Sequence, residues 1–360
     1  MSVVACLGAY DPGYPRNRIV RAALGLAGHT VLEARVPDRR AFRRWPRLVH
    51  AWARLERDPD VVFVPEFRHK DVAVARLLAG SRPLVFDPLV SRWDTLVGDW
   101  RLHAPDSAQA RWNRTIDRIA FAASDRILCD TWAHGELFAE LGAERSRLRR
   151  VLVGAEATFF DVPSAPTDVP VRILYVGGFL PLHGVGTMLD AFARMAHDPA
   201  LRGRYEVVMV GDGIEYAQAR AEAERDGLAN VTFAGRLSYA DLPSVIADAH
   251  VVLGAFGVGA KTGRVIPHKL WQGLAAGRAV VTGDGPGPRE VFVDGRDLLL
   301  VPRGDGAALA AALGALVTDP ARRTALGAAG RAAAHVWGHP SAIAGQLREA
   351  FAGLPGMGDA

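Results

Sequence analysis

The chain has 360 residues, a length that favours two domains over one. Its hydrophobic content of 49% and charged content of 23% are typical of a soluble globular protein, and no apolar run approaches the roughly 20 residues that a membrane-spanning helix needs. The net charge of +4 is mild and permits anionic ligands, whereas no zinc-finger spacing, RNP motif or basic tail indicates nucleic acid.

The N-terminus enters an apolar run without a basic region, so we do not expect a signal peptide. The two cysteines, Cys6 and Cys129, lack metal-ligand spacing and lie in apolar runs. Buried free thiols and a cytoplasmic protein are therefore expected.

Short apolar or β-branched runs alternate with longer segments of helical periodicity along the whole chain. We expect strands in the runs 3–9, 29–36, 61–66, 83–87, 126–130, 150–155, 171–178, 205–213, 231–235, 250–256, 278–284 and 298–302. Between them lie helical patterns such as residues 184–196, where apolar residues recur every three or four positions. Strands that alternate with helices predict parallel sheets with helices on both faces.

A proline-rich polar stretch, residues 161–170, separates the two halves and is interpreted as a linker. We therefore predict an α/β protein with two doubly wound, Rossmann-like domains that face each other across a cleft. The expected bounds are 1–160 and 171–335, with a helical tail at 336–360 that packs back on the first domain. In such sheets ligands bind at the carboxyl ends of the strands.

The stretch 253–272, LGAFGVGAKTGRVIPHKLWQ, is the most unusual in the chain. Only three lysines occur, at positions 70, 261 and 269, and two of them lie in this glycine-rich segment. Arginine supplies nearly all other basic residues of the chain, and its planar guanidinium differs from the compact ammonium of lysine. Two lysines in one short segment therefore suggest a site that needs a point charge. A strand, a glycine loop and a helix beginning near Pro267 together predict a phosphate site.

The phosphate site is not of the Walker type. A P-loop would need glycines at positions 255 and 260, where the chain has Ala255 and Ala260. No G-x-G-x-x-G follows the first predicted strand either, which disfavours a dinucleotide-dependent dehydrogenase.

Further loops follow other strands of the second half. Gly177 and Gly178 form a turn, and a helix starts near Gly184 with His183 at the junction. Gly211 lies in a third turn, whereas Arg236 and Leu237 follow the next strand, where backbone groups can hold a base. Two glycine loops that open helices on one domain edge favour a diphosphate ligand.

The order of these motifs, VGGFLPLHG, VMVGDG, VTFAGRLSYADLP and KLWQGLAAGRAVVTGDGPGPREVFVDG, resembles the nucleotide-sugar-binding domain of the retaining family-four glycosyltransferases, which have the GT-B fold. The first half resembles them more loosely, through DPGYPRNRIVRAALGLAGHTV. The resemblance implies transfer of a sugar from a nucleotide diphosphate donor, with retention at the anomeric carbon and without a metal or other cofactor.

The chain departs from that family at its charged positions. The Arg and Lys of the family's first loop correspond to Gly178 and His183, and its two glutamates correspond to Arg264 and Gln272. We infer that the positive charge has moved to the second loop. Lys261, Arg264 and His183 are expected to stabilise the leaving diphosphate, Lys269 to support them, and Gln272 to bind the ribose.

The acceptor is expected on the first domain, at residues that follow its strands. Asp87 is the candidate catalytic residue there, and the other acceptor-side candidates are Asp11, Arg16, Glu66, His69, Lys70 and Asp94. The acceptor is a small molecule or a lipid-linked glycan.

The segment 39–58 holds seven arginines with Phe42, Trp45 and Trp52. It either contacts an anionic membrane from the cytoplasmic side or is a solvated helix whose tryptophans pack inward. Two alternatives to a transferase also stay open: a GT-B epimerase or pseudo-glycosyltransferase, and a non-catalytic nucleotide-sugar-binding protein.

Overall fold

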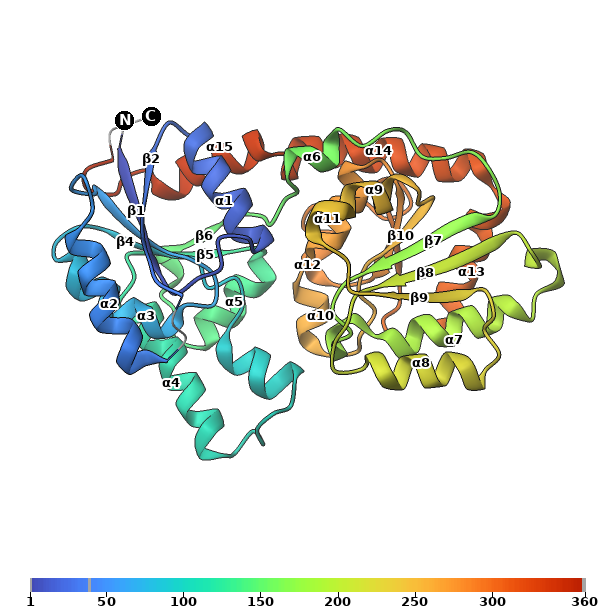
Figure 1. Ribbon diagram of the computed structural model, residues 1–360, viewed down its shortest axis with the longest axis horizontal. Helices are drawn as coiled ribbons and strands as arrows, with labels where there is room; N and C mark the ends of the chain where they lie inside the picture. Colours follow the sequence, from blue (N-terminus) through green and yellow to red (C-terminus); the bar gives the residue numbers. More distant parts are fainter. Residues whose placement is uncertain (1, 38–39, 358–360) are drawn as a thin grey trace. The chain divides into compact units, whose positions relative to one another are not determined.

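The structure is a computed structural model that describes residues 2–37 and 40–357, and it divides into two compact units (Figure 1). The first unit contains the chain up to Val153 together with the C-terminal segment from Pro340, and the second contains Gly154–His339. Each unit has its own parallel sheet of six strands.

The first unit is built on a sheet with the strand order β2-β1-β3-β4-β5-β6. The strands are β1 (Val3–Gly8), β2 (Thr30–Arg35), β3 (Val61–Val64), β4 (Leu84–Phe86), β5 (Arg126–Cys129) and β6 (Leu148–Arg150). All residues of β3 and β4 are buried, as expected for strands that are covered on both faces. The order reverses between β1 and β3, so the switch point of this sheet lies there.

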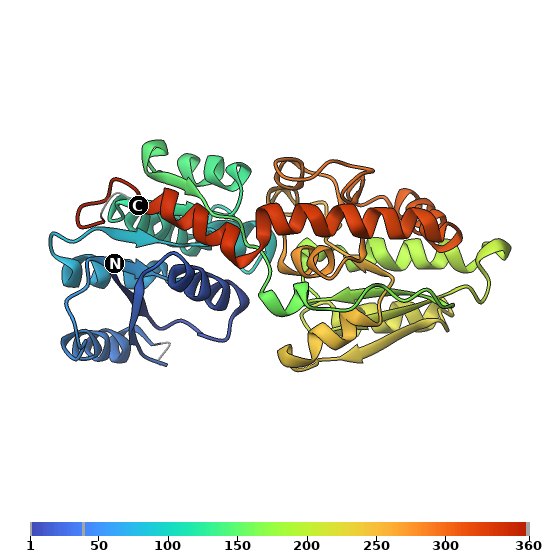
Figure 2. The ribbon, with the colours of Figure 1, turned by 90° about the horizontal axis from the view of Figure 1, so that it is seen from above.

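Helices cover both faces of the first sheet. They are α1 (Pro15–Leu26), α2 (Ala41–Ala53), α3 (His69–Ala79), the π-helical turn η1 (Asp94–Asp99), α4 (Ala108–Ala122), α5 (Trp132–Glu140), the short turn η2 (Arg145–Arg147) and α15 (Pro340–Phe351). Ser107 and Thr131 cap α4 and α5 by accepting a hydrogen bond from the backbone three residues on. Helix α15, the last of the chain, packs on α1, and both lie in the same unit (Figure 2).

The second unit has the strand order β12-β11-β10-β7-β8-β9, with its switch point between β7 and β10. Its strands are β7 (Val171–Val176), β8 (Tyr205–Val210), β9 (Val231–Gly235), β10 (Val251–Leu253), β11 (Ala279–Gly283) and β12 (Leu299–Val301). Its longer helices are α7 (Val185–Ala196), α8 (Tyr216–Arg225), α9 (Leu242–Ala247), α11 (His268–Ala275), α13 (Gly306–Thr318) and α14 (Pro320–Gly338). Its shorter helical segments are α6 (Ala157–Phe160), η3 (Pro181–His183), η4 (Pro199–Leu201), η5 (Tyr239–Asp241), α10 (Ala260–Arg264) and α12 (Pro286–Arg289).

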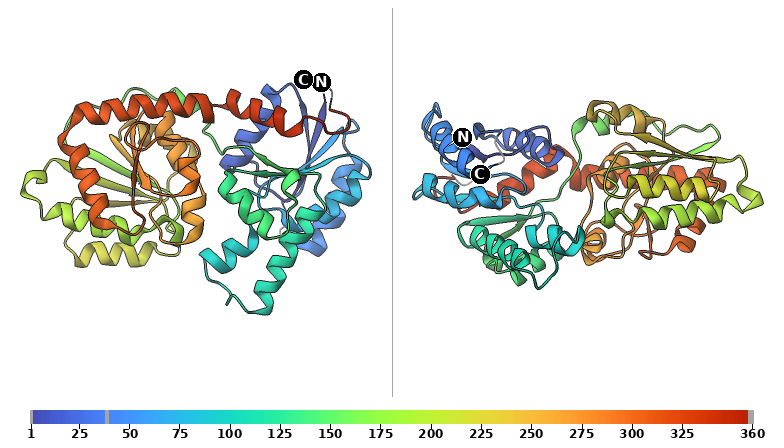
Figure 3. Two further views of the ribbon diagram at one scale, coloured as in Figure 1. Left: turned by 180° about the vertical axis from the view of Figure 1, so that it is seen from behind. Right: turned by 60° about the horizontal axis from the view of Figure 1, so that its bottom comes forward.

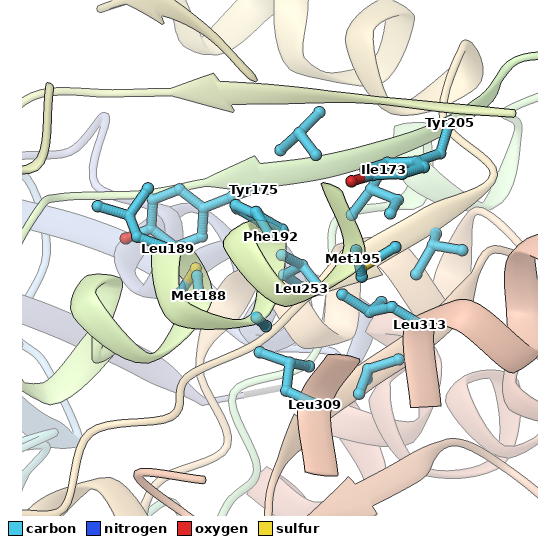
Figure 4. Packing of buried hydrophobic residues seen from close by; sticks show 14 of the residues in the cluster. Ile173, Tyr175, Met188, Leu189, Phe192, Met195, Tyr205, Leu253, Leu309 and Leu313 are labelled. Carbon is cyan, nitrogen blue, oxygen red and sulfur yellow. The ribbon is translucent and has the colours of Figure 1, made fainter. Parts of the chain in front are cut away.

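Helices lie on both faces of the second sheet (Figure 3). Ile173, Tyr175 and Leu253 belong to the core that α7, α8 and α13 cover, together with Met188 and Leu309 (Figure 4). On the other face α11 lies so close to Val252 and Val280 that a Cβ at its Gly273 would come within 2.9 Å of Val252. Both faces of the sheet are therefore buried at the central strands β10 and β11, whereas the edge strand β9 is partly exposed.

The predicted strands coincide with observed strands except in the sixth run. β6 ends at Arg150, so most of 151–155, which we expected to be a strand, lies outside the sheet, although Val151 N–H still donates to Cys129 O of β5 at 2.8 Å. Residues 161–170, which we expected to link two domains, lie within the second unit. In the part of the chain that the structure describes, no helix combines the length and hydropathy needed to cross a bilayer.

Candidate functional site

The two glycine loops of the second unit lie side by side at its switch point. One loop follows β7 and the other follows β10, and these two strands pair with each other. Three hydrogen bonds connect the loops: Phe256 N–H donates to His183 O at 2.9 Å, Gly257 N–H to Leu182 O at 3.2 Å, and Thr262 Oγ1 to Leu182 O at 3.0 Å. The two loops thus form one connected edge.

Gly184 allows this close approach. Its φ is +65°, and a Cβ there would lie 2.5 Å from the backbone nitrogen of Gly257. Any other residue would strain the backbone and separate the loops. Gly211 has a similar role at the end of β8, because its φ is +131° and a Cβ would lie 1.9 Å from Gly177 O.

His183 is buried beneath the first loop and is 8% exposed. Its Nδ1 contacts Gly178 O and lies 2.9 Å from the Tyr175 hydroxyl, which itself donates to Gly178 O at 2.9 Å. Burial lowers the pKa of His183 well below its ordinary value. The imidazole of the free protein is therefore neutral near pH 7 and shapes the loop through these contacts. Its expected role at the leaving diphosphate stays a prediction.

The two lysines of the second loop are both buried, with 7% of Lys261 and 6% of Lys269 exposed, and Arg264 is half-buried. None of the three side chains is on the open surface. Lys269 Nζ lies 4.2 Å from the centre of the Tyr175 ring, beneath Gly177, where a Cβ would come within 2.4 Å of the nitrogen. Lys269 and Lys261 both lie close enough to His183 to act on it electrostatically when charged, so the two lysines flank the first loop.

Gln272 is 4% exposed and belongs to a hydrogen-bonded chain that the sequence did not indicate. Its Nε2 donates to the Tyr239 hydroxyl at 3.1 Å, and that hydroxyl donates to Glu156 Oε1 at 3.0 Å. Glu156 is thus connected to the residue that we expect to bind the ribose, although 116 positions separate them. Arg236 and Leu237, the expected base-binding residues, are exposed after β9, the edge strand.

A pocket of about 470 Å³ adjoins the second loop and contains two further arginines. It is lined by Val258, Asp284, Gly285, Pro286, Arg289, Pro302 and Arg303. Arg289 pairs with Asp284 at 2.6 Å, while Arg303 Nη1 donates to Gly259 O at 2.6 Å. Sequence reasoning missed Arg303, whose only signal was its position directly after the last strand.

The first unit gathers polar residues at its own switch point, between β1 and β3. Asn17 Nδ2 donates to Asp11 O at 2.7 Å, and Arg68 Nη1 donates to Ala9 O at 2.8 Å. Glu66 is 7% exposed, and its Oε2 has no hydrogen-bond partner among the described residues. Burial raises the pKa of Glu66 to about 7, against the opposing charge of Arg68. Glu66 can therefore hold or release a proton near neutral pH.

Arg16 and Asp87 form a buried ion pair, with Nε 2.7 Å from Oδ2. Arg16 also donates to the carbonyls of Leu152 at 2.6 Å and Val151 at 3.0 Å. The pair therefore joins α1, β4 and the chain after β6. Because Asp87 is 1% exposed and holds a structural cation, its position differs from that of the accessible catalytic group we expected.

The other acceptor-side candidates do not converge on this edge. His69 is buried against the edge of the Phe86 ring, with Nε2 3.4 Å from Asp117 Oδ1. Lys70 is exposed on α3, and Asp94 is buried in η1, where Ser91 Oγ accepts its backbone N–H at 3.0 Å. Thus Asp11 and Glu66, with Arg16 and Asp87 beside them, are the candidates that the structure brings together.

The basic and aromatic residues of helix α2 lie partly in the core of the first unit and partly on its surface. Arg44 is buried and pairs with Asp71 at 2.6 Å, and Trp52 packs against the core of the first unit. Trp45 is 38% exposed. The exposed arginines of this segment are Arg40, Arg43, Arg47, Arg54 and Arg57. Arg39 and the side chain of Phe42 lie outside the described residues.

Sequence comparisons find similarity to known proteins in the second unit. A model of the family described as "Glycosyl transferases group 1" matches residues 170–319. A D-inositol 3-phosphate glycosyltransferase of Kribbella flavida is 32% identical over 229 residues, 58% of this chain and 51% of that protein. An O-antigen chain mannosyltransferase C of Escherichia coli is 30% identical over 151 residues, 40% of this chain and 36% of that protein. The chain thus spans about half the length, or less, of these curated relatives.

Solved structures match both units of the chain. HepE of Anabaena in complex with UDP has a TM-score of 0.73 at 15% identity, over 98% of this chain and 100% of that one. A sucrose-phosphate synthase of Thermosynechococcus elongatus has a TM-score of 0.74 at 17% identity, over 98% of both chains. The fold is therefore that of the GT-B glycosyltransferases. More narrowly, residues 170–319 of the second unit match the model of the group 1 glycosyl transferases.

Proposed function

We propose that the protein is a glycosyltransferase that moves a sugar from a nucleotide diphosphate sugar to a hydroxyl or amine of an acceptor. The observation that carries this proposal is the connected pair of glycine loops at the switch point of the second unit, with Lys261, Lys269 and Arg264 around it. Backbone N–H groups and cations at such an edge bind phosphate.

The cations also account for the chemistry. Cleavage of the donor leaves a nucleoside diphosphate, so negative charge grows on the phosphate oxygen as the bond to the sugar breaks. Lys261 and Arg264 stabilise that charge more strongly in the transition state than in the bound substrate, which accelerates the reaction. The leaving phosphate then accepts the proton of the acceptor.

We further propose that transfer retains the anomeric configuration and needs no metal. Retention follows from the resemblance to family-four enzymes. Independence from metal is supported by the cations, which take the place that a metal would have beside a diphosphate.

A donor panel tests the proposed function. The protein is incubated with UDP-, GDP- and dTDP-sugars without acceptor, and released nucleoside diphosphate is measured. We expect slow release with one donor class, and at least tenfold slower release by Lys261→Ala. A matched control is Arg225→Ala, which removes an exposed cation from α8. A new sugar isomer would indicate an epimerase, and tight binding without turnover would indicate a non-catalytic protein; either result contradicts the proposal.

For the acceptor, we propose a lipid-linked molecule reached by peripheral contact of α2 with the cytoplasmic membrane face. Trp45 and the exposed arginines of residues 40–57 support this, because an anionic surface attracts clustered arginines and interfacial tryptophan. Co-sedimentation with vesicles of phosphatidylglycerol should exceed that with phosphatidylcholine and fall in Arg43→Glu/Arg47→Glu. Equal, negligible sedimentation with both vesicles would leave a soluble small molecule as the acceptor.

A further inference from the structure

Lys269 is buried without a counter-charge. Its Nζ has no hydrogen-bond partner among the described residues, and it lies over the face of Tyr175 at 4.2 Å. A cation–π contact of this kind compensates only part of the cost of removing an ammonium from water. Such an arrangement destabilises the protein unless a ligand provides a negative charge beside the ammonium.

The groups that face Lys269 from the neighbouring elements are Tyr175 and His183, and neither carries a negative charge. From β7 it faces the neutral phenol of Tyr175, whose pKa is raised well above its ordinary value by burial and then by Glu215. From η3 it faces the neutral imidazole of His183, and Lys261 on α10 acts on that same imidazole. Burial alone lowers the pKa of Lys269 well below its ordinary value, with no carboxylate among the described residues opposing it.

Lys269 lies beside the first glycine loop, where we expect the diphosphate of the donor. The ammonium lies close beside the backbone of Gly177, where a Cβ would come within 2.4 Å of Nζ, so a side chain at that position would displace it. Gly178 and His183, which correspond to charged positions in the resembling family, carry no charge here. Lys269 lies beside the same loop and can therefore bind the diphosphate in place of those charged residues.

We propose that Lys269 anchors the diphosphate of the donor, and that it stands neutral in the free protein and takes up a proton as the nucleotide binds. This inference rests on the proposed function and specifies how its donor site works. No covalent step is involved: the amine gains a proton from solvent, and the diphosphate becomes the counter-ion that the protein does not supply. Binding and protonation are then linked, so affinity falls as the pH rises.

Isothermal titration calorimetry of the full chain tests this proposal. UDP and GDP are titrated at pH 8.5, where their own phosphates are already ionised, in HEPES and in Tris. The difference in apparent enthalpy between the two buffers gives the number of protons taken up. We expect uptake approaching one proton per bound nucleotide in the wild type.

Two variants separate Lys269 from its neighbour. Lys269→Met replaces the ammonium with an apolar chain of similar length, and we expect at least tenfold weaker binding without proton uptake. Its melting temperature should stay equal or rise, because a buried unpaired amine has been removed. Lys261→Met should weaken binding but retain the uptake. Arg225→Met, on the surface of α8, is the control for loss of a cation and should change neither.

The outcomes distinguish the inference from the proposed function. Wild-type affinity and proton uptake in Lys269→Met would overturn the inference and leave the glycosyltransferase proposal intact. A lowered melting temperature with unchanged uptake would make Lys269 a packing residue and overturn it too. Failure of the wild type to bind either nucleotide or any nucleotide sugar would remove both proposals.

Discussion

Replacement of Asp87 by asparagine separates a structural role from a catalytic one. Arg16 is completely buried, and its guanidinium is held by Asp87 and by the carbonyls of Leu152 and Val151. Removal of one partner of a buried ion pair costs about 3–5 kcal/mol, because it leaves an uncompensated charge. Asparagine keeps an oxygen that can accept one hydrogen bond from Arg16. We therefore expect the lower end of that range, about 3 kcal/mol.

The assay is urea denaturation at pH 7, followed by fluorescence of the eight tryptophans. The midpoint of the first unit should fall in Asp87→Asn, while nucleotide binding by the second unit stays intact. The double variant Arg16→Met/Asp87→Leu should be less destabilised than the sum of its single changes, since it removes both charges together. A loss below about 1 kcal/mol combined with complete loss of turnover would refute this reasoning and return Asp87 to a catalytic role.

Three further predictions concern other buried groups. Burial raises the pKa of Glu66 in the folded protein to about 7, above its ordinary value of 4.5, so the native state binds more protons than the unfolded state between these pH values. The free energy of unfolding should therefore fall by up to about 3 kcal/mol as the pH rises from 4.5 to 7. Glu66→Gln should remove this pH dependence in denaturation curves recorded at several pH values. Gly211→Ala should lower the free energy of unfolding by at least about 2 kcal/mol and weaken nucleotide binding, because the φ of Gly211 is +131° and a Cβ there would meet Gly177 O. The control Gly186→Ala in α7, which has open space around it, should be neutral or stabilising. Equal denaturation midpoints for the two variants would contradict the packing described. Cys6 and Cys129 are buried, and burial raises the pKa of Cys6 to about 12, so Ellman's reagent should react slowly with native protein and release two thiols in denaturant; rapid reaction of the native protein would show that these thiols are accessible.

The parts of the fold that depend on local pattern could be predicted from the sequence. Buried strands such as VVFV at 61–64, and glycines directly after strands, specify the sheets and the two loops of the second unit. The parallel order then places the loops after β7 and β10 next to each other, because both strands end at one edge.

The parts that depend on distant partners could not be predicted. Arg16 and Asp87 are 71 positions apart, so nothing in either motif indicated that they form an ion pair. The neutral state of His183 and the unpaired state of Lys269 follow from burial, which a glycine-rich sequence does not reveal. The same holds for Glu156 and Tyr239, which are connected to Gln272 only through tertiary structure.

The helix that completes the first unit is synthesised after the whole of the second unit. Phe351 of α15 packs near Phe63 and His29, with ring centres 6.5 and 5.8 Å away, respectively, so the core of the first unit includes a side chain that follows the second unit in the sequence. On the ribosome the first 153 residues must therefore wait, with this surface open, until the second unit and α15 have emerged. The second unit, which is continuous from Gly154 to His339, can fold before its predecessor is finished.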